Sequence, residues 1–152
     1  MKRLVKIIKE SFALELSSIH GIKHWKNIER IGKYLAKYTG ADKKVIRLFA
    51  LLHDSKRENE DYDSEHGLRA SLFLKDLYNK KLLKISAKQL EQLMFACEHH
   101  DNSEIKSDDI TIQTCWDADR LDLWRLGVEP EKELLNTKVA KEDKTIEIAR
   151  KL

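Results

Sequence analysis

The pair His53-Asp54 is the part of this chain best placed to do chemistry. It follows directly on an almost unbroken apolar run at residues 45–52, which is expected to be buried on many sides. Burying an unpaired carboxylate is strongly unfavourable, so Asp54 needs a cation, a hydrogen-bond network or a metal ion beside it. Five other histidines and Asp117 elsewhere in the chain favour the metal ion.

Imidazole and carboxylate donors limit which metal the chain could bind. Together they suit borderline divalent ions, which include Mn, Fe, Co, Ni and Zn, whereas Mg prefers oxygen ligands and retained water. The expected cofactor is a divalent ion, either one of these five or Mg, with one or two ions per chain and the identity left open. The donors lie on separate expected helices, as in the metal sites of helix bundles. They are His24, His53, Asp54, His66, His99, His100 and Asp117.

Apolar residues at helical spacing predict an all-α fold of about six to eight helices. Ser86 and Gln89 form a capping-box pattern, Ser64 is a candidate N-cap, and Gly40 occupies the usual position after the end of a helix. Strand alternation is scarce. The expected helices cover residues 4–16, 23–38, 42–54, 65–80, 86–99 and 112–126, with one or two more after residue 130.

Length and composition predict one domain over residues 1–152, with a core at about 20–126 and peripheral helices at both ends. Because 41% of the residues are hydrophobic and 36% are charged, we expect a highly charged globule rather than a disordered chain. The net charge of +3 is spread in small groups without a dense basic stripe. Nucleic-acid binding is therefore not expected.

The cysteines and the amino-terminal residues predict a cytoplasmic protein. Cys97 and Cys115 lie in apolar stretches without a CxxC partner, and are expected to be buried thiols rather than a disulfide. Charges at Lys2, Arg3 and Lys6 interrupt any signal-peptide core. No apolar span is long enough to cross a bilayer, so no membrane partner is expected.

Several short strings surround the candidate donors. They are His20-Gly21-x-x-His24-Trp25, Leu51-Leu52-His53-Asp54-Ser55, Glu65-His66-Gly67 followed by Ala70, Ala96-Cys97-x-x-His100, and the run from Cys115 to Leu123. Together these strings resemble small stand-alone members of the HD-domain superfamily of metal-dependent phosphohydrolases. The resemblance covers most of the chain and is far more specific than an isolated His-Asp pair. It implies a single helical HD-domain bundle.

The resemblance also implies which residues bind metal. The positions of His66 and His100 hold a second ion in two-metal members, with Asp54 bridging the two ions. In one-metal members these histidines face the substrate phosphate, and the sequence leaves both roles open. The implied ligands of the principal ion are His24, His53, Asp54 and Asp117.

Two neighbouring histidines compete for these roles. His20 competes with His24, and Trp25 immediately downstream favours His24, which leaves His20 as a packing residue or a partner of a ligand. His99 competes with His100, and the spacing from the preceding Ala-Cys pair favours His100. All three tryptophans are expected to belong to the core.

The acidic run near residue 120 offers further candidates. Asp119 is expected to hydrogen-bond a basic group such as Arg120, and Asp122 to hold the orientation of a ligating imidazole. Asp117 is the ligand by its match to the string. Asn27 departs from the pattern, because similar proteins often have arginine there, which puts a surface or phosphate contact in doubt.

These residues predict a metal-dependent phosphohydrolase that cleaves a phosphomonoester or phosphodiester, such as a nucleotide, with metal-activated water. The expected catalytic residues are Asp54, Lys56 and Arg57, the two cations stabilising charge on the phosphoryl oxygens. His66 and His100 are expected to bind the substrate if they do not bind metal. The expected partner is a small phosphorylated substrate. The alternative is a non-catalytic sensor or adaptor that binds metal or nucleotide, and the strings set neither substrate nor oligomeric state.

Overall fold

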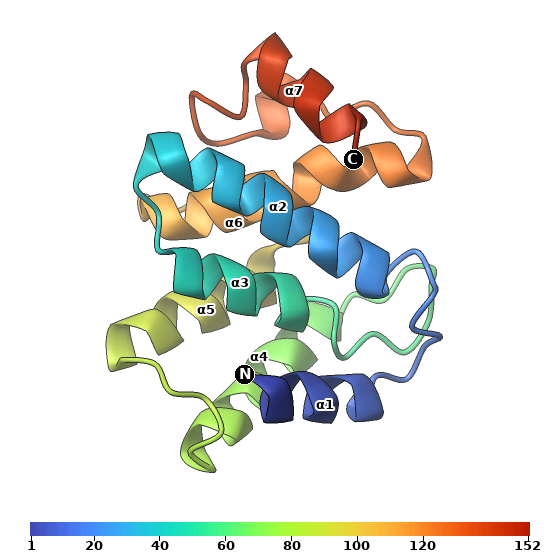
Figure 1. Cartoon of the computed structure of the whole chain (residues 1–152), viewed down its shortest axis with the longest axis vertical. Helices are drawn as coiled ribbons and strands as arrows, with labels where there is room; N and C mark the ends of the chain where they lie inside the picture. Colours follow the sequence, from blue (N-terminus) through green and yellow to red (C-terminus); the bar gives the residue numbers. More distant parts are fainter.

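The computed structural model describes residues 1–152 and contains seven α-helices and two 3-10 helices (Figure 1). No residue lies in a β-strand, so the predicted all-α fold and the expected number of helices are confirmed. None of the helices is long and apolar enough to span a membrane. The helices are α1 (Lys2–Ser11), α2 (Ile22–Thr39), α3 (Lys43–Leu52), α4 (His66–Asn79), α5 (Ala87–His99), α6 (Ile110–Leu121), η1 (Asp122–Leu126), η2 (Lys132–Leu134) and α7 (Asp143–Arg150).

Most helix boundaries follow from capping residues in the sequence. The predicted capping box of α5 is present, because the Ser86 hydroxyl accepts the Gln89 backbone N–H and the Gln89 side chain accepts the Ser86 N–H. Asp42 and Asp109 cap α3 and α6, each accepting two backbone N–H groups. Gly40 ends α2 at a φ of 73°, a left-handed conformation that suits glycine.

Several boundaries differ from the predictions, and two of these differences lie near the histidines. α1 ends well before residue 16, because residues 12–21 fold into turns, one of them closed by the Ile22 N–H donating to the Leu16 carbonyl at 2.9 Å. The N-cap of α4 is Glu65 rather than Ser64, and it provides no side-chain cap. Both differences arise where the chain approaches the histidines, and local signals there yield to tertiary contacts.

The packing of the helices brings several of their ends together. α2 packs against α3 and α6, α4 packs against α5, and α3 and α5 are also in contact. In Figure 1, α7 lies at the top of the molecule and α1 in its lower half, with α2, α3 and α6 at heights between them. Buried apolar side chains fill the interior, among them Ile28, Leu52, Leu93 and Trp116. The start of α2, the ends of α3 and α5 and the start of α4 therefore share one region.

Gly67 allows α4 to approach α5 closely. A Cβ atom at this position would lie 2.6 Å from the carbonyl oxygen of Glu98 and 2.7 Å from that of Cys97. Both oxygens belong to a helix backbone, which cannot move aside as a flexible side chain does. Because His66 precedes Gly67 and His100 follows the last turn of α5, this close approach sets the distance between the two histidines.

We expect Gly67→Ala to force α4 away from α5 and to lower the free energy of unfolding by about 1–3 kcal/mol, as overpacking usually does. Leu72→Ala is the matched control, because Leu72 lies on the same helix with 57% of its surface exposed. The control should change the stability by less than about 0.5 kcal/mol. Urea unfolding followed by circular dichroism measures both, and equal stabilities for Gly67→Ala and the unaltered protein would contradict the close contact.

Candidate metal centre

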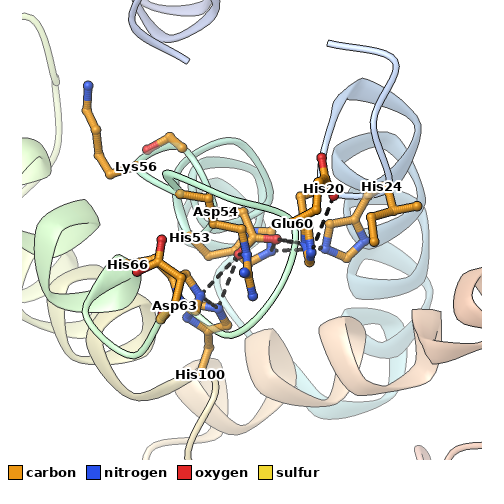
Figure 2. A network of polar contacts seen from close by, with 12 residues as sticks. His20, His24, His53, Asp54, Lys56, Glu60, Asp63, His66 and His100 are labelled. Atoms are coloured by element: carbon orange, nitrogen blue, oxygen red, sulfur yellow. Dashed lines mark hydrogen bonds and ion pairs between the residues drawn. The ribbon is translucent and has the colours of Figure 1, made fainter. Parts of the chain in front are cut away.

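Histidines from four helix ends surround the carboxylate of Asp54. His24 lies in the first turn of α2, and His53 follows the last residue of α3. His66 begins α4, and His100 follows the last residue of α5. All five side chains are buried. Figure 2 shows the imidazoles grouped on the two sides of Asp54.

The first group of donors lies on the α2 side of Asp54. The Nε2 atoms of His24 and His53 are 3.1 Å apart. Asp119 on α6 places Oδ1 at 3.3 Å from the His24 Nε2 and 3.8 Å from the His53 Nε2. Asp54 contributes Oδ2, at 3.5 Å from His24 and 3.3 Å from His53. Four potential ligand atoms, from α2, the end of α3 and α6, therefore converge.

The second group lies on the α4 and α5 side. The Nε2 atoms of His66 and His100 are 2.9 Å apart. Asp54 contributes its other oxygen, with Oδ1 at 3.2 Å from the His66 Nε2 and 3.5 Å from the His100 Nε2. Asp54 therefore faces both groups, one carboxylate oxygen to each.

Hydrogen bonds at the far side of each ring show that this donor set fits a metal ion. The Nδ1 atoms of His53, His66 and His100 each face a backbone carbonyl, which only accepts, so each Nδ1 carries a hydrogen. In the neutral rings the Nε2 lone pairs of His66 and His100 then point at one another. Bonds of about 2.1 Å would put neighbouring ligand atoms about 3.0–3.4 Å apart in octahedral or tetrahedral coordination, close to the spacings found here.

Burial and ion pairing set the charges of the group. Burial raises the pKa of Asp54, but the neighbouring histidines, His53 foremost, outweigh it and hold that pKa well below its usual value. Burial lowers the pKa of His53 and thus favours its neutral form. Burial also opposes charge on His24, yet its hydrogen bonds with nearby carboxylates, that of Asp119 foremost, raise its pKa to about 10. His24 therefore holds a proton that a metal ion must displace on binding.

A surrounding layer of hydrogen bonds fixes these side chains. Asp122 accepts from the His24 Nδ1 at 2.6 Å, as predicted for a residue that orients an imidazole. Asn27, the position that departs from the resemblance, donates to the other Asp122 oxygen at 2.9 Å. His20, in the turns before α2, lies with Nδ1 2.9 Å from the Oδ2 of Asp54. The structure thus places His20 beside a candidate ligand. This agrees with the second of its two predicted roles, that of a partner of a ligand.

The structure corrects the prediction for Asp117. Its Oδ1 accepts the backbone N–H of Asn136 at 2.7 Å, and its Oδ2 accepts the backbone N–H and the hydroxyl of Thr137, each at 2.7 Å. Burial raises the pKa of Asp117, against the effect of these hydrogen bonds. Asp117 therefore ties the segment before α7 to α6 and takes no part in the histidine groups.

Helix geometry explains the error. Successive residues of an α-helix are rotated by about 100°, so Asp117 and Asp119 project about 200° apart and cannot both face the histidines. Asp122 follows Asp119 by three positions and lies near the same face of the helix. Asp122 was expected to orient a ligating imidazole and therefore to face the histidines. Because Asp119 lies three positions earlier on nearly the same face, the sequence already indicated Asp119 rather than Asp117 as the metal ligand.

The two cations after Asp54 differ in placement, which corrects the prediction for Lys56. Lys56 points away from the histidines (Figure 2), with Nζ 3.4 Å from the Ser11 carbonyl and 3.9 Å from the centre of the Phe73 ring. Arg57 turns the other way and donates from Nε to the Asp54 Oδ1 at 3.1 Å. Of these two cations, only Arg57 is placed to act on a ligand at this centre.

Other predicted side chains also have defined positions. His100 faces the centre, whereas His99 lies outside it and packs edge-on against Phe95, with ring centroids 4.6 Å apart. Trp25 and Trp116 belong to the core, and Trp124 is partly buried against it. The two cysteines are buried free thiols.

A cleft of about 300 Å³ opens beside the two groups of donors. Its polar lining includes Asp54 and His100, and its apolar wall consists of the three leucines that line it, so a small molecule could contact the centre through it. Three arginines contribute to its surface, of which the sequence indicated only Arg57. The lining residues are His20, Asp54, Arg57, His100, Asp101, Ser103, Asp119, Arg120, Leu123, Arg125, Leu126 and Leu134.

The fold is shared with a solved structure. No protein-family model and no curated protein sequence matches this chain. The crystal structure of a predicted HD superfamily hydrolase from an uncultured Thermotogales bacterium superposes with a TM-score of 0.72. The match covers 99% of this chain and 85% of the other, at 22% sequence identity. The chain therefore has the helical fold of that protein, as the resemblance in its sequence implied.

Asn substitutions at the two aspartates of α6 separate metal binding from stability. We expect Asp119→Asn to weaken Mn²⁺ binding more than about tenfold, because one ligand oxygen is lost. Asp117→Asn should leave that affinity within about threefold, yet lower the free energy of unfolding by about 1–3 kcal/mol, since buried donors near Asn136 or Thr137 lose an acceptor.

Isothermal titration calorimetry measures the Mn²⁺ affinity, and urea unfolding of the metal-free protein measures the stability. Each variant serves as the control for the other. The opposite pattern, with metal binding lost in Asp117→Asn and kept in Asp119→Asn, would restore Asp117 as the ligand.

Proposed function

We propose that this protein is a metal-dependent phosphohydrolase that acts on a small phosphomonoester or phosphodiester. The observation that carries the proposal is the bridging position of Asp54, with one oxygen directed at His24 and His53 and the other at His66 and His100. The shared fold with a predicted HD superfamily hydrolase supports the same conclusion.

The proposed ligands of a first divalent ion are His24, His53, Asp54 and Asp119. His66 and His100, with the second oxygen of Asp54, are the proposed ligands of a second ion. A divalent ion bound there supplies an acidified water and compensates the charge of the phosphoryl oxygens.

The chain's own side chains prepare this reaction. Arg57 binds Asp54 and also donates from Nη1 to the Asp61 carbonyl at 3.0 Å, so its guanidinium is fixed at the cleft before substrate arrives. Such a preorganised cation stabilises charge that develops on the phosphoryl group. His20 holds the other side of the Asp54 carboxylate. The apolar wall of the cleft, which includes Leu123, keeps part of the site dry.

The test combines metal analysis with a hydrolysis screen. Protein purified without chelator is analysed for metals, loaded with Mn²⁺ or Co²⁺, and assayed with p-nitrophenyl phosphate, bis(p-nitrophenyl) phosphate and a panel of nucleotides. We expect turnover that Asp54→Asn reduces by more than about 100-fold while the circular dichroism spectrum is kept. Asp108→Asn, which alters an exposed carboxylate, is the matched control and should retain full activity.

Failure of the metal-loaded protein to cleave any of these compounds would contradict the hydrolase proposal. Tight metal binding without turnover would instead favour the non-catalytic sensor.

A further inference from the structure

Arg120 is a buried cation with an unused donor. The residue is 9% exposed, and its Nη1 donates to the Leu134 carbonyl at 2.8 Å. Its Nη2 is buried and has no hydrogen-bond partner. Buried polar groups in proteins are nearly always hydrogen-bonded, so the unused Nη2 shows that Arg120, a residue that also lines the cleft, has an incomplete set of partners.

The other two arginines of the cleft are already paired. Arg57 lies 3.1 Å from an oxygen of Asp54, and Arg125 lies 3.9 Å from an oxygen of Asp122. Arg120 forms no ion pair, since no carboxylate oxygen lies within the 4.0 Å limit for one. Of the three, only Arg120 has a positive charge without a directly paired carboxylate.

The surroundings of Arg120 compensate its charge only in part. The guanidinium lies over the Trp116 ring, 5.7 Å from the ring centroid, which provides a weak cation–π contact. Burial lowers the pKa of Arg120, while the more distant charges of Asp119, Asp117 and Asp101 act in the opposite direction. An anion in the cleft beside the guanidinium would supply the missing compensation.

The position of Arg120 in the cleft indicates which part of a substrate it meets. Its hydrogen bond to Leu134 holds the guanidinium at the apolar wall, where Leu123 and Leu126 also lie. Arg57 is held instead at Asp54, beside the histidines. The two guanidinium groups are thus anchored at different parts of one cleft.

We propose that Arg120 binds a second phosphate of the substrate, separate from the phosphoryl group that reacts at the histidines. The inference rests on the proposed phosphohydrolase function and narrows its substrate class to compounds with at least two phosphate groups. A guanidinium presents several N–H groups that match phosphate oxygens, and Arg120 lines the cleft without a paired carboxylate. The remainder of the substrate then lies along the three leucines of the wall.

Non-hydrolysable probes test this subsite by equilibrium binding. Methylphosphonate carries one phosphonate group and methylenediphosphonate carries two. Both are titrated by calorimetry into Mn²⁺-loaded protein at a fixed excess of free Mn²⁺, with matching titrations into buffer to subtract binding of the probe to the ion. We expect the diphosphonate to bind at least about tenfold more tightly than the monophosphonate, as one charge-assisted contact provides.

Substitutions at Arg120 then show whether this residue causes the difference in affinity between the two probes. Arg120→Gln should remove most of the preference for the diphosphonate and leave methylphosphonate affinity within about twofold, whereas Arg120→Lys should retain part of the preference. Arg47→Gln, which removes an arginine outside the cleft, is the matched control and should change neither affinity. The thermal unfolding midpoint of each variant shows whether it is folded. If Arg120→Gln does not fold, the partial loss of the diphosphonate preference in Arg120→Lys provides the test.

The outcomes separate this inference from the function on which it rests. Equal binding of the two probes by the unaltered protein, or an equal loss of both affinities in Arg120→Gln, would overturn the second-phosphate subsite even if phosphate esters are cleaved. Preferential diphosphonate binding that depends on Arg120 supports the subsite, and if no ester is cleaved it is the hydrolase proposal that fails.

Discussion

One buried carboxylate determines how the helix ends of this protein are arranged. Asp54 is 2% exposed, and each of its oxygens faces a pair of imidazoles from two different helices. A charge in this position is tolerated only when donors or cations surround it on every side. The ends of α3 and α5 and the beginnings of α2 and α4 are therefore held in one place by the same requirement. Gly67 provides the close approach of α4 and α5, and Gly21 permits the tight turn that brings His20 to Asp54, because a Cβ there would collide with the Leu16 carbonyl.

The chain compensates its buried carboxylates in two different ways. Asp117 is surrounded by N–H and O–H donors from Asn136 and Thr137, which engage both of its oxygens and give it a structural role. Asp54 is surrounded mainly by imidazoles whose Nε2 atoms converge, an arrangement that suits a metal ion better than it suits a proton alone. The same residue type on neighbouring elements thus serves stability in one case and, in our proposal, chemistry in the other. The identity of the donors around each carboxylate makes the difference.

The sequence predicted the helices and the histidines better than it predicted the acidic residues. Apolar spacing and capping residues such as Ser86 act locally, so α5 could be placed without knowledge of the fold. The position of His53-Asp54 after an apolar helix likewise required burial. The choice between Asp117 and Asp119 depended on which face of α6 meets α2, which the three-residue spacing of Asp119 and Asp122 did indicate. The direction of Lys56 depended on a contact with Phe73 from another helix. The unpaired state of Arg120 could not be predicted at all, because it follows from which carboxylates its neighbours in space already bind.

Anomalous X-ray diffraction from crystals grown with Mn²⁺ tests the central role of Asp54 most directly. Data collected at the manganese absorption edge locate the ions without reference to any assay. We predict at least one anomalous peak in contact with a carboxylate oxygen of Asp54, with His24, His53 and Asp119 as the other protein ligands. A second peak between Asp54, His66 and His100 would show a two-metal centre. The absence of any peak beside Asp54 in crystals grown with an excess of Mn²⁺ would contradict the account.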